Sequence, residues 1–180
     1  MAKAREIPGI DPDAPYALAA ARVVGIRAEE LVEHAGGVLD VAEIERVHDM
    51  RVATRRLRAA LEVFRPCFPK EEFKGVLAEV KAIADALGER RDRDVTIAAL
   101  EDFGEALAAP DRPGIESLVA KLRSEQAEAN ADLAGFVDRA RLERLRARLE
   151  ALVAAAEEQG APAEVASVNG GDPGAQELAR

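Results

Sequence analysis

Apolar residues recur every three to four positions along most of this chain, and glycine or proline interrupts the pattern at intervals. One such set is Tyr16, Ala19, Ala20, Val23, Val24 and Leu31. This spacing places apolar side chains on one face of an α-helix and leaves the other face to charged residues. The apolar content is mostly Ala, Leu and Val, with 3% aromatics, which favours helix over strand. The predicted fold class is all-α, an antiparallel helical bundle of about five to six helices.

Breaker residues divide the chain into segments. The expected helices cover residues 13–36, 41–65, 70–88, 90–109 and 115–136, with a sixth, partly continuous with the fifth, ending near 158. Gly36, Pro66, Gly88 and Pro110 are the expected stops. In the fourth helix the expected buried stripe is Val95, Ala99, Phe103 and Leu107. We therefore predict an irregular leader over 1–12, a helical bundle over 13–158 and a disordered tail over 159–180.

Cysteine content and hydropathy limit the cellular setting. Cys67 is the single cysteine, so an internal disulfide scaffold is excluded. The N-terminus lacks the apolar segment of a secretory signal. No stretch approaches the roughly 20 uninterrupted apolar residues that span a bilayer. The expectation is a cytoplasmic protein with no membrane partner.

Charge is distributed unevenly. The formal net charge is −9, yet residues 46–93 hold 12 Lys and Arg against 8 Asp and Glu. Between Met50 and Lys70 there are six basic residues and only one acidic residue, Glu62. An acidic protein therefore carries one basic region, which is the candidate site for an anionic partner.

The helix expected over 41–65 has two distinct sides. At about 100° per residue, four residues and Glu62 fall within roughly 80° of one another. These four, which we call the basic ridge, are His48, Arg51, Arg55 and Arg58. The opposite side collects the apolar residues Met50, Ala53, Leu57, Leu61 and Phe64. Arg56 points elsewhere, beside Val52. The helix is thus predicted to bury one side and present the other.

The basic ridge spans about 15 Å along the helix axis. Guanidinium groups offer paired donors that match phosphate oxygens and stay charged at physiological pH, so an extended phosphate polymer would neutralise the ridge well. The alternative is that these arginines are solvated or paired with carboxylates of neighbouring helices. His48 taken by itself favours a buried, hydrogen-bonded structural histidine over a ligand contact.

A second charged cluster follows Leu87 and Gly88. If Gly88 ends one helix, the backbone N–H groups that open the next, together with Arg90 and Arg91, can help to hold an anion. The alternative is that Asp92 caps that helix and Asp94 pairs with an arginine. The preceding helix places Lys74 and Lys81 on one face, where they add positive charge or are simply solvated.

The stretches Val47 to Arg58, Ala86 to Gly88 and Arg91 to Val95 together resemble the CHAD family, named for a histidine in an α-helical domain. The resemblance implies a helical bundle whose basic surface binds inorganic polyphosphate. The sequence has no P-loop, no Cys/His metal spacing and no serine-nucleophile motif, so neither catalysis nor a cofactor is expected. Some members associate with polyphosphate granules and accompany CYTH-type triphosphate-processing domains. The binding residues it implies are His48, Arg51, Arg55, Arg58, Lys81 and Arg91, then Arg56, Lys74 and Arg90.

The resemblance has departures. Full-length members look like two related helical halves, and this chain has one complete motif set. One hypothesis is a half-length member that completes its groove as a homodimer. Arg141, Arg144, Arg146 and Arg148 are a candidate second basic helix, but no histidine precedes them at the matching spacing.

The sequence raises three alternative functions. The pair His48-Asp49 resembles the HD motif of metal-dependent phosphohydrolases, which needs a further histidine on a separate helix, and His34 is the only other one. A structural or adaptor bundle with internal Arg–carboxylate pairs is the main alternative. A nucleic-acid binder is disfavoured, because few aromatic side chains are available to stack on bases and the net charge is negative.

Overall fold

The computed structural model describes residues 3–161, and this part of the chain forms an all-α structure. The helices are α1 (Tyr16–His34), α2 (Ile44–Val63), α3 (Lys70–Ala106), α4 (Arg112–Phe136) and α5 (Arg139–Gly160). Two short 3₁₀ turns, η1 (Arg65–Cys67) and η2 (Ala109–Asp111), join α2 to α3 and α3 to α4. The predicted fold class is confirmed. None of the described helices is long and apolar enough to cross a bilayer.

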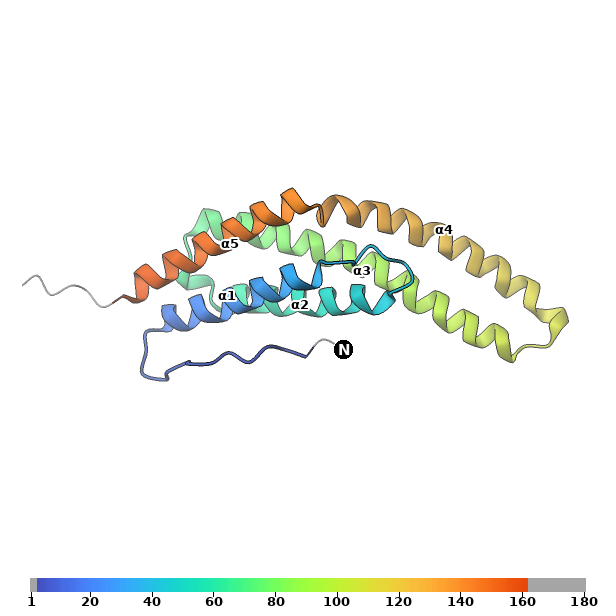
Figure 1. Ribbon diagram of the computed structural model, residues 1–180, viewed down its shortest axis with the longest axis horizontal. Coiled ribbons are helices and arrows are strands. Elements are labelled where there is room, and N and C mark those ends of the chain that lie inside the picture. Colours follow the sequence, from blue (N-terminus) through green and yellow to red (C-terminus); the bar gives the residue numbers. More distant parts are fainter. Residues whose placement is uncertain (1–2, 162–180) are drawn as a thin grey trace, which may run out of the picture.

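Helices α1 to α4 alternate in direction, as expected for short connections, whereas α5 continues in the direction of α4. α1 packs on α2 and α5, α2 packs on α3, and α3 packs on both α4 and α5. The first half of α3 completes a four-helix bundle with α1, α2 and α5, whereas its second half and α4 extend beyond the bundle as a two-helix hairpin (Figure 1). α4 and α5 lie almost in line, separated where Asp138 caps α5 by accepting a hydrogen bond from the N–H of Arg141 (3.1 Å).

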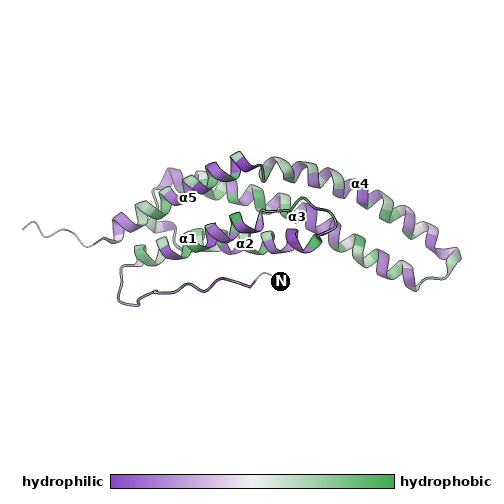
Figure 2. Cartoon of the chain, in the orientation of Figure 1, coloured by the Kyte–Doolittle hydropathy of each residue, from purple (hydrophilic) through white to green (hydrophobic). Residues whose placement is uncertain are grey.

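Every helix is amphipathic, and hydrophobic and hydrophilic residues alternate along each one (Figure 2). The core lies inside the four-helix part of the molecule. Its fully buried members include Leu31 of α1, Leu57 and Leu61 of α2, Ile83 of α3 and Leu149 of α5. Burial of such side chains contributes about 1.5–3 kcal/mol each. The position of α2 is therefore fixed by its apolar side.

The expected break at Gly88 is wrong, because α3 continues through it without interruption. A glycine that ends a helix usually adopts a positive φ. Among the described residues positive φ occurs at Gly9 and Gly37, and Gly37 does follow the end of α1. Glycine inside a helix destabilises it by about 1 kcal/mol relative to alanine. The long helical segments on either side and the burial of Leu87 offset this loss. The two helices expected over 70–109 are one.

The apolar stripe expected for the fourth helix is also wrong. Val95 and Phe103 are 49% and 54% exposed, and Ala99 is exposed as well. The side of α3 that turns inward at this level carries Arg90, Asp94 and Ile97. The hairpin has only two helices, so most of the surface of α3 has no neighbour there. The spacing of apolar residues predicted a stripe along this part of α3, but it did not predict which side of α3 packs against α4.

The leader before α1 forms no helix over residues 3–15 and runs back beside the bundle (Figure 1). Arg22 of α1 donates hydrogen bonds to the carbonyl oxygens of Pro8 (2.7 Å) and Gly9 (2.9 Å). α5 ends at Gly160, and the tail expected to be disordered lies, from residue 162 on, outside the described residues.

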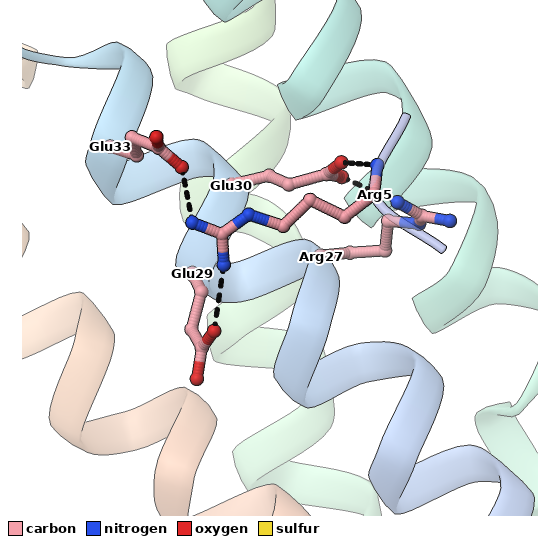
Figure 3. Close-up of polar contacts among 5 residues, drawn as sticks. All are labelled: Arg5, Arg27, Glu29, Glu30 and Glu33. Atoms are coloured by element: carbon pink, nitrogen blue, oxygen red, sulfur yellow. Dashed lines mark hydrogen bonds and ion pairs between the residues drawn. The ribbon is translucent and has the colours of Figure 1, made fainter. Parts of the chain in front are cut away.

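A charged cluster fastens the leader to α1 (Figure 3). Arg5 pairs with Glu29 (2.9 Å) and Glu33 (2.5 Å) at the surface. Its backbone N–H donates to Glu30 (2.6 Å), a carboxylate only 1% exposed that also pairs with Arg27 (2.7 Å). Burial by itself raises the pKa of Glu30, but the hydrogen bonds from Arg5 and Arg27 outweigh burial, so the pKa lies below its ordinary value.

This pKa predicts an acid-sensitive contribution to stability. The native state binds the Glu30 proton less readily than the unfolded chain, so the contribution is complete at neutral pH and is lost as the pH falls through the ordinary glutamate range. Glu30→Gln should reduce the free energy of unfolding by about 1–3 kcal/mol at pH 7, and this difference should shrink between about pH 5 and 3. Urea unfolding at several pH values measures it. The exposed Glu116→Gln serves as control, and a pH-independent difference would contradict the assignment.

Candidate functional site

The two sides of α2 separate as predicted. Met50, Ala53, Leu57 and Leu61 are all 0% exposed, and Phe64 packs against the core from its edge. The basic ridge lies on the opposite side, where Arg55 is exposed and the other three members are half-buried. The packing of the apolar side therefore orients the ridge outward.

The middle of the basic ridge has no internal counterions. Within residues 3–161, no side chain forms an ion pair or hydrogen bond with His48, Arg51 or Arg55. Two guanidinium groups one helical turn apart are thus left to solvent. Like charges at this spacing repel each other, which an external anion relieves.

The C-terminal end of the ridge is neutralised. Glu62 Oε1 lies 3.1 Å from Arg58 Nε and 3.5 Å from Lys81 Nζ of α3. The hydrogen bond from Arg58 is the largest effect on the Glu62 carboxyl and, with that from Lys81, holds its pKa below the ordinary value. Glu62 is therefore ionised at neutral pH.

At the N-terminal end of α2, Arg91 of α3 reaches across to the ridge helix. It donates to the carbonyl oxygen of Ile44 (3.1 Å) and pairs with Glu45 (3.3 Å). Lys81, Gly88 and Arg91 fall on the side of α3 that faces α2, because their spacing of seven and three residues is near-helical. Charged groups of two antiparallel helices thus line one surface.

Comparison with known families identifies the fold that carries this surface. A sequence model described as the CHAD domain matches residues 22–180. The chain belongs to the CHAD family. A comparison with curated proteins found no match. CHAD domains are associated with the binding of polyphosphate or triphosphate.

The residues predicted as one binding site do not all lie together. Arg56 lies on the other flank of α2, near enough to Glu30 for its charge to lower the pKa of that carboxyl. Lys74 shares the α3 face of Lys81 but pairs with Glu71 (2.9 Å) of its own helix instead of with a residue of α2. Six of the predicted binding residues lie on the ridge side of α2 or pair with α2 from α3: His48, Arg51, Arg55, Arg58, Lys81 and Arg91.

The prediction that Arg90 belongs to the binding site is wrong. Arg90 is 0% exposed and lies 3.2 Å from the buried Asp94, so an external polymer does not reach it. The N–H groups around it bond within α3, so the anion-binding helix start expected there does not exist. The alternative interpretation of Asp94 as the partner of an arginine is the one observed.

The buried pair Arg90–Asp94 of α3 contacts α4 through Asp94. Gln126 of α4 donates to Asp94 Oδ1 (2.6 Å), whereas the three guanidinium nitrogens of Arg90 make no hydrogen bond within the described residues. Burial lowers the pKa of Arg90 and raises the pKa of Asp94, because it disfavours both charged forms. The pair holds the base of the hairpin in this CHAD domain.

One group in the described chain has the ligand types for a metal ion. Donor atoms of Glu45, His48 and Asp49 lie within 4.8 Å of one another, all on one turn of α2. His34 is not part of it. Arg91 already pairs with Glu45, and its positive charge opposes a cation there. The second histidine from a separate helix that an HD-type phosphohydrolase needs is absent from this group.

Sequence reasoning missed Glu45 and the pairing of Glu62 with Lys81. Glu45 and Glu62 neutralise Arg91 and Lys81, which lie 46 and 19 residues further along the chain. No local signal indicates such pairs, because they depend on how α2 and α3 pack. Glu62 was recognised only as an acidic residue on the ridge side of its own helix.

Proposed function

We propose that this CHAD domain binds inorganic polyphosphate, without catalysing a reaction on it, through the basic ridge of α2 and the adjoining Lys81 and Arg91 of α3. The observation that carries the proposal is that Arg51 and Arg55 have no counterion within residues 3–161. A flexible phosphate chain neutralises such a row of fixed charges and gains several charge-assisted hydrogen bonds. Membership of the family supports the same ligand class.

The net charge of −9 accords with a local site rather than a generally cationic surface. Charge separated from the ridge by more than a Debye length, about 8 Å at physiological ionic strength, is largely screened. Binding therefore depends on the residues of the α2–α3 surface and should be strongly salt-dependent. The acidic remainder of the molecule disfavours long, stiff polyanions that must cross it, such as duplex DNA.

The test is a titration of the protein with polyphosphates of several lengths at increasing salt, with DNA as competitor. We expect the logarithm of the affinity to fall linearly with the logarithm of salt concentration, with a slope that grows by about 0.7–0.9 for each phosphate contacted. DNA should compete poorly. Absence of binding at low salt, or affinity insensitive to salt, would contradict the proposal.

A structural or adaptor bundle is the second candidate, favoured by the ion pairs that Arg58, Lys74, Lys81, Arg90 and Arg91 make within the chain. It leaves Arg51 and Arg55 without a role. In that case the titration shows no binding, and the arginines of the ridge can be replaced without functional loss.

We also propose partners that follow from the family. These are a CYTH-type triphosphate-processing protein, polyphosphate granules and a second copy of the chain. Exposed apolar side chains on the projecting hairpin, Val95, Phe103 and Leu118, are available for a homodimer. Sedimentation velocity distinguishes a dimer from a monomer, and co-purification with polyphosphate tests the granule association.

A further inference from the structure

Glu62 occupies an unusual place beside the basic ridge. Its Oε1 atom is shared by Arg58 of α2 and Lys81 of α3, at 3.1 and 3.5 Å. It is the single acidic residue between Met50 and Lys70, so its charge stands against a uniformly basic segment. The carboxylate thus occupies the position in which a phosphate oxygen would contact Arg58 and Lys81.

The three side chains of this cluster are within reach of a ligand. Glu62, Arg58 and Lys81 are 44%, 43% and 42% exposed. Ion pairs with this exposure contribute little to stability, typically 0–1 kcal/mol, because water and salt screen them. The two cations can therefore exchange one anionic partner for another without disturbing the fold.

The cluster differs from the middle of the ridge, where the arginines have no carboxylate partner among the described residues. Two to three helical turns before Glu62, Arg55 and Arg51 have no partner within residues 3–161. A phosphate chain seated on these two arginines and extended along the ridge meets Arg58 and Lys81 next. It gains those contacts only by displacing the carboxylate, which then remains nearby as a repelling charge.

We propose that Glu62 is a built-in counterion that competes with phosphate for Arg58 and Lys81 and so lowers the affinity of the ridge for polyphosphate. The inference rests on the proposed function. This competition makes the ridge specific for polyphosphate. A ligand must supply enough phosphates to displace a carboxylate held by two cations, and weak or singly charged anions cannot displace it.

The test compares the wild type with Glu62→Gln, which keeps the size of the side chain and removes its charge. The control is Glu143→Gln, because Glu143 pairs with Arg139 (2.9 Å) on the solvent side of α5 and the substitution removes the same single charge. We expect Glu62→Gln to bind polyphosphate about 3- to 10-fold more tightly than Glu143→Gln, as two exposed ion pairs no longer compete. The salt slope should steepen by about one, since a further cation then contacts phosphate.

Each outcome is decisive. Equal affinity of Glu62→Gln and Glu143→Gln overturns the inference, and weaker binding by Glu62→Gln also overturns it, because Glu62 then positions Arg58 and Lys81 instead of competing for them. Circular dichroism melting of both variants confirms that the comparison is between folded proteins. Failure of the wild type to bind polyphosphate at all overturns the proposed function itself, which is a separate and recognisable result.

Discussion

Replacing Arg51, Arg55 and Arg58 together with alanine is expected to abolish polyphosphate binding and leave the helical fold intact. Each charge-assisted hydrogen bond is worth about 1.5–3 kcal/mol, so losing three should weaken binding at least 100-fold at low salt. The salt slope should fall by about three. Stability should change little, because these side chains lie outside the core and alanine favours helix.

A matched control removes three positive charges elsewhere. Lys121 and Arg123 of α4 are 73% and 64% exposed, and Arg139 of α5 is 91% exposed. Their triple alanine variant has the same net charge as the ridge variant, and it should retain most of the affinity. Binding is measured by titration calorimetry and helicity by circular dichroism. Equal loss in the two variants would show that polyphosphate recognises overall charge rather than the ridge.

The second large effect concerns stability. Asp94→Ala is expected to lower the free energy of unfolding by about 3–5 kcal/mol, because it leaves the fully buried Arg90 guanidinium without a compensating charge. It also removes the acceptor of the hydrogen bond from Gln126 of α4. The loss falls where the hairpin leaves the bundle, so the contact between α3 and α4 should loosen first.

Urea unfolding compares this variant with two others. Asp92→Ala removes a neighbouring carboxylate from the exposed side of α3 and should change stability by no more than about 0.5 kcal/mol. The double variant Arg90→Met with Asp94→Leu replaces both charges by apolar groups and should recover most of the loss. A change below about 1 kcal/mol for Asp94→Ala would mean that water reaches the pair in solution.

The apolar side of α2 shows how far local pattern can determine structure. Met50, Leu57 and Leu61 were predicted to be buried from their spacing alone, and all three are fully buried. The rule works here because α2 has neighbours along its whole inner side and solvent on the other. Val95 and Phe103 of α3 follow the same spacing and are exposed, because only α4 accompanies α3 at that level.

Gly88 shows a second limit of prediction from local sequence, which concerns where a helix ends. Glycine both ends helices and occurs inside them, and the choice depends on whether the residues on either side keep packing against the same neighbours. In α3 Leu87 is buried before it and Arg90 and Asp94 after it, so the helix continues. With the helix unbroken, Arg90 turns into the α3–α4 contact and Arg91 turns toward α2.

The sequence by itself determined the all-α class, the two-sided character of α2, the outward position of the basic ridge and the CHAD resemblance. These follow from periodicity and from residues adjacent in one helix. Only the tertiary structure decided which cations keep a counterion. Glu62, Glu45 and Asp94 acquire their roles through the packing of α3 against α2 and α4, and the distances between side chains of different helices are not encoded in local spacing.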